Sequence, residues 1–375
     1  MGQLRRTLSI DIETFSSIDI AKAGLYKYAQ SKDFEILLFG YAFDDEPVKL
    51  IDLAQKEQLP EELVAALFDK NVVKTAYNAA FEWYCINRFW KSPIEQWQCT
   101  MVKGLYCGYP AGLKAIGDAI GLEEDKKKLL TGKALIRYFC MPCIPTKTNG
   151  GRTRNYPKHD MDKWNLFKEY NKQDVVTERE IKKILNKVHF PEKEQKMWEI
   201  DMMMNACGVK VDRKLVEGAL AIGKKRTEDL INEAQKISGL DNPNSIAQLK
   251  EWLEIEIGDK IDSLNKKDVP ELIKNTDSKK VKRMLEIRQE LSKTSTKKYD
   301  AMEAAMGEGD RVRGLLQFYG ANRTGRWAGR LVQVQNLPQN HLSMLNFARE
   351  LVKNKDLDSI QLIYRQHPRY PFTAD

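Results

Sequence analysis

The sequence contains no long hydrophobic run and no disulfide-rich region. In its 375 residues no apolar stretch approaches the roughly 20 residues that a membrane-spanning helix needs, which excludes a membrane span and a membrane partner. The N-terminus is polar and basic and leads directly into a strand-like pattern, so no secretory signal is expected. Six cysteines in so long a chain, without the framework of a small secreted domain, predict reduced thiols in a cytoplasm.

Several short motifs that would assign a function are also missing. Neither a Walker loop nor a G-x-G-x-x-G fingerprint occurs, so nothing supports ATP hydrolysis. Cys140 and Cys143 have the spacing of half a zinc site, and His159 follows in the same segment. No second pair with such spacing follows, so free thiols are favoured over a zinc ribbon.

The composition is that of an ordinary globular protein. Hydrophobic residues make up 42% and charged residues 30%, enough apolar material for a sizeable core, and the length suits two or three domains. A formal net charge of +8 is compatible with a polyanionic partner but does not identify one.

Strand and helix patterns change along the chain. Strand-like runs at 7–13, 34–43, 48–53 and 72–77, with helical spacing at 59–70 and 80–90, predict an α/β domain. A long helix is expected over 161–187. Beyond it, 192–206, 213–237, 245–254 and 278–306 predict a mainly helical domain, and an irregular stretch rich in Gly, Arg and Gln follows residue 309.

Two carboxylates stand on the first predicted strand. Leu8, Ile10 and Ile12 alternate there with Ser9, Asp11 and Glu13. The period of two points Asp11 and Glu13 to the same side of the sheet, where paired acids usually require cations. For such a pair alone, a solvated strand face is the simpler interpretation.

Two later segments change that interpretation. Asn78, Phe81 and Glu82 lie where a strand passes into a helix, and Tyr170 and Asp174 share one face of the long helix at i and i+4. In this order the three segments resemble the three motifs of the DEDDy 3′–5′ exonucleases. The resemblance implies an RNase H-like domain, a mixed sheet flanked by helices.

The residue types suit the chemistry that this resemblance implies. Two divalent ions about 4 Å apart can activate a water and stabilise the leaving 3′-oxygen of a phosphodiester. Mg²⁺ or Mn²⁺ prefers oxygen ligands. The resemblance implies that Asp11, Glu13, Glu82 and Asp174 bind the two ions, and that Tyr170 orients the attacking water. Glu82 departs from the family, which usually has aspartate there, so reduced activity or altered metal preference is expected.

The rest of the chain resembles family A DNA polymerases of bacteriophages and prophages. Residues 194–201 and 205–212 resemble the segment that opens the thumb, 242–249 a motif within it and 291–299 its end. Thr324-Gly325-Arg326 and Gln335-Asn336-Leu337-Pro338 resemble the T-G-R…Q-N-x-P stretch that enters the palm. The resemblance therefore predicts an exonuclease domain over 1–190, a helical thumb over 191–310 and the start of a palm over 311–375.

The later palm and finger motifs of that family do not occur before Asp375, so polymerisation by this chain alone is not expected. The chain would be a truncated gene product, a fragment or a natural split product, which a separate palm and fingers chain could complete. The expected location is the cytoplasm of a bacterial host.

DNA is the expected partner, as a single-stranded 3′ end and as a primer–template duplex. Positive charge concentrates on one predicted helical hairpin, where hydroxyls can also bond phosphate oxygens. The residues are Lys279, Lys280, Lys282, Arg283, Arg288, Lys293, Lys297 and Lys298, with Thr294, Ser295 and Thr296. The resemblance places Arg323, Arg326, Gln335 and Asn336 near the primer end and Asn78 near the substrate backbone.

Three alternatives remain open at this point. The aromatic residues at 81–97 could stack single-stranded bases, although near-helical spacing favours a core role for most of them. The chain could be a non-catalytic module that binds primer–template DNA. It could also be a ribonuclease of the DEDD kind, which the thumb motifs disfavour.

Overall fold

The computed structural model describes residues 6–124, 132–292, 297–321, 324–337, 339 and 341–364, and the backbone of 366–367 and 370–371. By internal contacts the chain forms two compact units. One comprises Met1–Lys210 and Ala305–Leu337, and the other Val211–Ala304 and Pro338–Asp375. The three domains proposed from the sequence, 1–190, 191–310 and 311–375, stay a prediction.

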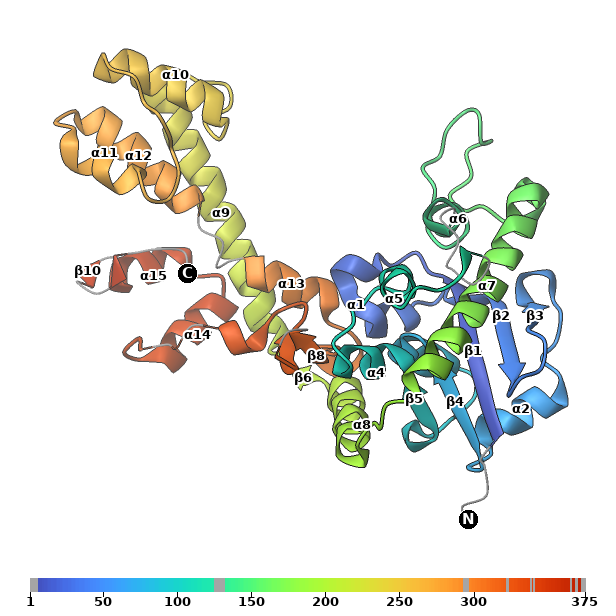
Figure 1. Cartoon of the computed structure of the whole chain (residues 1–375). Helices are drawn as coiled ribbons and strands as arrows, with labels where there is room; N and C mark the ends of the chain where they lie inside the picture. Colours follow the sequence, from blue (N-terminus) through green and yellow to red (C-terminus); the bar gives the residue numbers. More distant parts are fainter. Residues whose placement is uncertain are drawn as a thin grey trace. The chain divides into compact units, whose positions relative to one another are not determined.

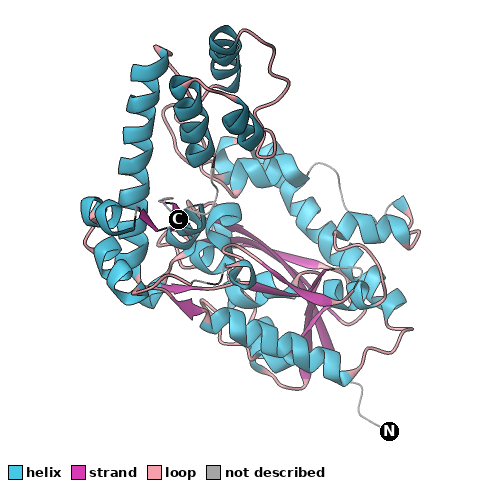
Figure 2. Ribbon diagram, turned by 90° about the vertical axis from the view of Figure 1, so that its left-hand side faces the viewer, coloured by secondary structure: helices cyan, strands magenta, loops and turns pink. Residues whose placement is uncertain are grey.

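The first unit contains a five-stranded mixed sheet (Figures 1 and 2). Its order is β3-β2-β1-β4-β5, formed by β1 (Arg6–Phe15), β2 (Glu35–Phe43), β3 (Lys49–Asp52), β4 (Val72–Ala76) and β5 (Trp97–Cys99). The neighbours β1, β2 and β3 are antiparallel, whereas β4 is parallel to both β1 and β5. The predicted α/β class and its mixed sheet are confirmed.

The two faces of this sheet have different partners. Helices α2 (Glu61–Phe68) and α3 (Ala79–Ile86) share a hydrophobic core with Leu8, Ile10 and Ile12 of β1. The long helix α7 (Met161–Leu185) crosses the strands on the other face, the face of Ser9, Asp11 and Glu13 (Figure 1). The alternation of side chains along β1 therefore gives the sheet one apolar face and one polar face, and helices cover both.

Further helices and short strands complete this unit. The helix over 20–29 was not predicted, and Gly24 interrupts it with a φ of 79°. The remaining elements are α1 (Ile20–Ala29), α4 (Thr100–Tyr106), α5 (Leu113–Ala119), α6 (Gly132–Phe139), α8 (Glu192–Cys207), the pair β6 (Val209–Lys210) and β7 (Arg311–Val312), and the hairpin β8 (Leu316–Ala321) and β9 (Arg326–Gly329).

Buried polar side chains of α8 form hydrogen bonds with the β8–β9 hairpin. The Asn205 amide donates to the Leu316 carbonyl at 3.0 Å and accepts from its N–H at 2.9 Å, as a neighbouring strand would. The Trp327 indole donates to Asp201 at 2.8 Å. Segments about 110 residues apart in the sequence, 201–205 and 316–327, thus form one substructure.

The second unit is mainly helical. Side chains of Asp212, Ser245 and Ser278 cap the N-termini of α9, α10 and α12, as expected for these residue types. Of the helical stretch predicted over 278–306, α12 covers Lys279–Leu291 and α13 covers Lys297–Ala305, and residues 293–296 lie outside the described residues. The elements are α9 (Arg213–Ser238), α10 (Ile246–Ile257), α11 (Val269–Asn275), α12 (Lys279–Leu291), α13 (Lys297–Ala305), α14 (Leu345–Lys353), α15 (Leu357–Tyr364), β10 (Gln366–His367) and β11 (Tyr370–Pro371).

Across the residues that the structure describes, no helix combines the length and apolarity needed to cross a bilayer.

Candidate active site

Asp11 and Glu13 lie on the polar face of β1, which α7 covers. Ser9 is 2% exposed and Glu13 8% exposed, and Asp11 is partly buried. A solvated strand face is therefore the wrong interpretation of this pattern. Burial makes the charge of these acids costly, so their surroundings decide what they can do.

Asn171 of α7 holds Asp11. Its Nδ2 donates to the Asp11 carbonyl oxygen at 3.2 Å and to Asp11 Oδ2 at 2.6 Å. Asn171 is fully buried, and Gly40, the residue paired with Asp11 on β2, makes room for it. A Cβ at Gly40 would collide with the Asn171 amide. Asn171 lies between Tyr170 and Asp174 in the third motif, and sequence reasoning gave it no role.

Cys140 lies against the second strand acid. Its Sγ donates a weak hydrogen bond to Glu13 Oε2 at 3.8 Å. Burial, and then the nearby Glu13 carboxylate, raise the pKa of the Cys140 thiol well above its ordinary value, so it stays protonated and can donate. None of the six cysteines, all of which lie within the described residues, forms a disulfide.

Glu82 enters the site from the first turn of α3. The side chain is 5% exposed, and its Oε2 is buried without a hydrogen-bond partner among the described residues. Burial raises the pKa of Glu82 well above its ordinary value, and the charges of Asp11, Glu178 and Asp174 raise it further. A buried carboxylate oxygen without a donor is a group that a cation would satisfy.

Tyr170 and Asp174 face the same site from α7, one helical turn apart and both buried. Burial, then the charge of Asp174, and then those of Glu13 and Asp11 raise the pKa of Tyr170, which also donates a hydrogen bond to Asp174. The Tyr170 ring packs on Gly132 at the start of α6, where a Cβ would collide with it. The phenol is thus neutral, fixed in place and surrounded by carboxylates.

These residues form one group, which we call the carboxylate cluster: Asp11, Glu13, Glu82, Tyr170 and Asp174. Their charges act on one another's pKa values although they come from β1, α3 and α7. The oxygen donors suit Mg²⁺ or Mn²⁺. Within the described ranges, however, no three His, Cys, Asp or Glu side chains stand ready to hold one ion. The cluster has the chemistry of a cation site without a closed ligand shell.

Glu178 is a further carboxylate beside the cluster, and sequence reasoning missed it. It lies one helical turn beyond Asp174, is 2% exposed, and contributes to the raised pKa of Glu82. The available signal was the spacing, because residues at i and i+4 share a helix face.

The predicted DNA-contacting residues are only partly described. Lys293, Thr294, Ser295, Thr296 and Arg323 lie outside the described residues. Of the others, Asn78 precedes α3 and is exposed, without a side-chain capping bond. Lys297 is exposed at the start of α13.

Arg326, Gln335 and Asn336 are exposed on the first unit. Arg326 begins β9, next to the Trp327 that is bonded to Asp201. Gln335 packs against Gly329, where a Cβ would collide with its amide. An exposed arginine on a braced hairpin is suited to contact a polyanion.

The basic residues of α12 differ in their availability. Arg283 is held by Glu233 through two hydrogen bonds of 2.6 and 2.8 Å, and Lys280 by Glu256 at 2.7 Å. Lys279 and Lys282 are exposed. Acids therefore neutralise part of the charge that the sequence assigned to phosphate contact.

The aromatic residues over 81–97 also differ in how exposed they are. Trp97 is fully buried, whereas Phe89 is 53% exposed and stacks on Phe34 with centroids 6.1 Å apart. Phe89 also lines a cavity of about 360 Å³ together with Arg154 and Tyr156. The other aromatic residues of the stretch are partly buried and pack against the core, whereas Phe89 offers a ring to a ligand.

No family model matches the chain. Over 365 residues, 97% of the chain, it is 54% identical to the DNA polymerase of Bacillus phage SP02 and covers 56% of that protein. The chain therefore spans about half the length of the curated relative it matches.

Two solved structures are similar to the chain. The polymerase domain of Pol1 from M. smegmatis, in complex with DNA primer-template and dNTP, matches with a TM-score of 0.50 and 14% identity, covering 90% of this chain and 53% of that one. At this identity the likeness concerns the fold. Escherichia coli RNase D, an exoribonuclease involved in structured RNA processing, matches with a TM-score of 0.34 and 10% identity, covering 96% and 93%.

Proposed function

We propose that this chain, a homologue of the DNA polymerase of Bacillus phage SP02 over about half of that protein's length, is a 3′–5′ DNA exonuclease. It would hydrolyse the terminal phosphodiester of a DNA strand. The observation that carries the proposal is the carboxylate cluster, in which four acids and a tyrosine from three elements act on one another. Buried acids are relieved by protonation or by a bound cation, and the oxygen donors of this cluster are ligands that a divalent cation would take.

The cluster's own residues have distinct roles in this proposal. Asp11, Glu13, Glu82 and Asp174 would hold two divalent cations, Mg²⁺ or Mn²⁺. Tyr170, neutral and hydrogen-bonded to Asp174, would orient the attacking water. Asn171 fixes the Asp11 carboxylate, and Cys140 touches that of Glu13. When bound, the cations supply activation of the water and stabilisation of the leaving 3′-oxygen.

Contact with DNA would involve both units. Asn78 would lie near the strand being cut, and Phe89 could stack an unpaired base. Arg326, Gln335, Asn336 and the exposed lysines of the helical unit would contact a primer–template duplex, with Lys293, Thr294, Ser295, Thr296, Lys297 and Arg323 as further contacts. These roles correspond to the proofreading and thumb regions of a family A polymerase, acting in a bacterial host cytoplasm. A separate polymerase chain is a further proposed partner.

Incubation of the purified protein with end-labelled single-stranded DNA and Mg²⁺ or Mn²⁺ tests the activity. The wild type is expected to produce a ladder of fragments shortened from the 3′ end, and Asp11→Ala and Asp174→Ala to leave the strand intact. Asp45→Ala is the matched control, because Asp45 is an exposed acid of the same unit. Unchanged cleavage by both cluster variants would refute the site.

A non-catalytic DNA-binding module is the second candidate. The observation in its favour is that the cluster's acids do not form a ready ligand shell among the described residues. Intact substrate in every metal, together with retained DNA binding, would support this module over the enzyme. RNA and DNA strands of the same sequence should be compared in the same assay, because preference for RNA ends would indicate a ribonuclease.

A further inference from the structure

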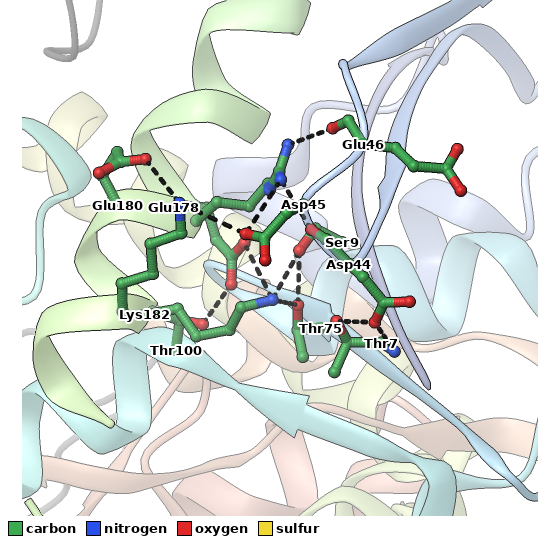
Figure 3. A network of polar contacts seen from close by, with 12 residues as sticks. Thr7, Ser9, Asp44, Asp45, Glu46, Thr75, Thr100, Glu178, Glu180 and Lys182 are labelled. Carbon is green, nitrogen blue, oxygen red and sulfur yellow. Dashed lines mark hydrogen bonds and ion pairs between the residues drawn. The ribbon is translucent and has the colours of Figure 1, made fainter. Parts of the chain in front are cut away.

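A network of polar contacts joins α7 to the strands β1 and β4 (Figure 3). At its centre, Lys182 Nζ of α7 donates to Ser9 Oγ of β1 at 2.7 Å and to Thr75 Oγ1 of β4 at 2.8 Å. The two hydroxyls are 3.1 Å apart, so the three groups close a triangle. One ammonium group therefore joins the long helix to two neighbouring strands.

Glu178 extends the network to a fourth element. Thr100 of α4 donates to its Oε1, and Lys182 Nζ lies 4.0 Å from its Oε2 (Figure 3). The side chains of Glu178 and Lys182 are 3% and 16% exposed. We call Ser9, Thr75, Thr100, Glu178 and Lys182 the α7 clamp.

Three members of the clamp lie close in the chain to residues of the cluster. Ser9 is two residues before Asp11 on the same face of β1, and Glu178 is one helical turn beyond Asp174. Thr75 lies on the strand that leads to Asn78 and Glu82. A shift of α7 that breaks the clamp would therefore move Tyr170 and Asp174 relative to the acids of β1 and α3.

Stability alone does not account for such a network. Replacing a buried ion pair by apolar residues of similar size is often neutral or stabilising, and in some proteins buried polar contacts instead select one arrangement of the elements. From this geometry, and resting on the proposed function, we propose that Lys182 and its acceptor Thr75 are positioning residues. They fix the register of α7 on the sheet and thereby the spacing of the carboxylates that bind the cations.

Two variants remove the clamp without adding bulk. Lys182→Met removes the ammonium and keeps the side-chain length, and Thr75→Val removes one acceptor and keeps the shape. Thr75→Ser restores the hydroxyl. Lys183→Met is the matched control, because Lys183 is the neighbouring residue of the same helix and forms its ion pairs with Asp45 and Glu180 at the surface.

Mn²⁺ affinity by calorimetry, kcat and KM on single-stranded DNA, and melting temperature are measured for each protein. Lys182→Met and Thr75→Val are expected to weaken Mn²⁺ binding about 10–100-fold, the range for residues behind metal ligands, and to lower kcat with KM unchanged. Thr75→Ser and Lys183→Met should keep wild-type values.

Lower melting temperatures with wild-type Mn²⁺ affinity would overturn the proposal, as would a wild type that binds no Mn²⁺. If the wild type binds Mn²⁺ but cleaves nothing, the hydrolase fails and the Mn²⁺ affinities alone decide on the clamp.

Discussion

Asn171 donates from one amide nitrogen to both the carbonyl and the carboxylate of Asp11, at 3.2 and 2.6 Å. The two residues are 160 positions apart in the chain. A strand acid is thus oriented by a helix that arrives much later in the sequence, and Gly40 makes the space for that contact.

Asn171→Leu should therefore impair the site more than the fold. The substitution removes the donor to Asp11 and keeps a similar volume, so Mn²⁺ affinity and cleavage are expected to fall about 10–100-fold. Calorimetry and the strand-cleavage assay measure this. Asn165→Leu, an exposed asparagine of the same helix, is the control and should change neither quantity. Equal effects of the two variants would contradict the role of Asn171.

Gly132→Ala should displace Tyr170. The added Cβ would collide with the phenol ring, and misplacing a catalytic group by about 1 Å can cost on the order of 100-fold in rate. We expect kcat to fall while Mn²⁺ binding through the carboxylates is largely kept. Gly223→Ala in α9 is the control, because a Cβ there meets nothing within 4 Å. That variant should retain activity and gain up to about 1 kcal/mol of stability.

Glu82→Asp and Glu82→Gln separate the charge of this residue from its length. Aspartate keeps a carboxylate, as in the family that the motif resembles, so cleavage should persist with a changed Mg²⁺ to Mn²⁺ preference. Glutamine removes the charge, and activity should fall on the order of 100-fold. Titration of both metals against cleavage rate is the measurement. Full activity of the glutamine variant would remove Glu82 from the proposed ligands.

Lys74 should make folding stability depend on pH in alkaline solution. It is fully buried and donates to the Asp69 carbonyl at 2.8 Å, and burial lowers its pKa to about 8 from 10.5. Between these values the unfolded chain binds the extra proton, so stability should rise with pH in that window and be lost as pH falls through 8. The rise is at most roughly 3 kcal/mol. Denaturant unfolding of wild type and Lys74→Met at several pH values isolates it, because the variant should lack this increment.

The lysines and the paired arginine of α12 should behave differently towards DNA. Lys279→Ala and Lys282→Ala remove exposed charges, so each should weaken duplex binding and reduce the salt slope by about 1 if it contacts a phosphate. Arg283→Met breaks the ion pair with Glu233 and should mainly lower thermal stability. Fluorescence anisotropy at several salt concentrations measures the first effect and thermal melting the second. Stronger loss of binding from Arg283→Met than from the lysine variants would reverse this assignment.

Much of the local structure could be predicted because it depends on neighbours in the chain. The alternation in β1 placed Asp11 and Glu13 on one face, and the i and i+4 spacing placed Tyr170 and Asp174 on one side of α7. A helix was predicted to begin at Ser278, and the Ser278 side chain caps the N-terminus of α12. The helix over 20–29 was missed because Gly24 interrupts its pattern.

The sequence by itself determined the α/β class, the faces of individual strands and helices, and the residue types available for cation chemistry. Tertiary structure decided which of those residues meet: Asn171 with Asp11, Tyr170 with Gly132, and Lys182 with Ser9 and Thr75. The physical reason is the distance along the chain over which each interaction acts. Periodicity and capping act over a few residues, whereas these contacts depend on how α6 and α7 pack against the sheet, which no local pattern encodes.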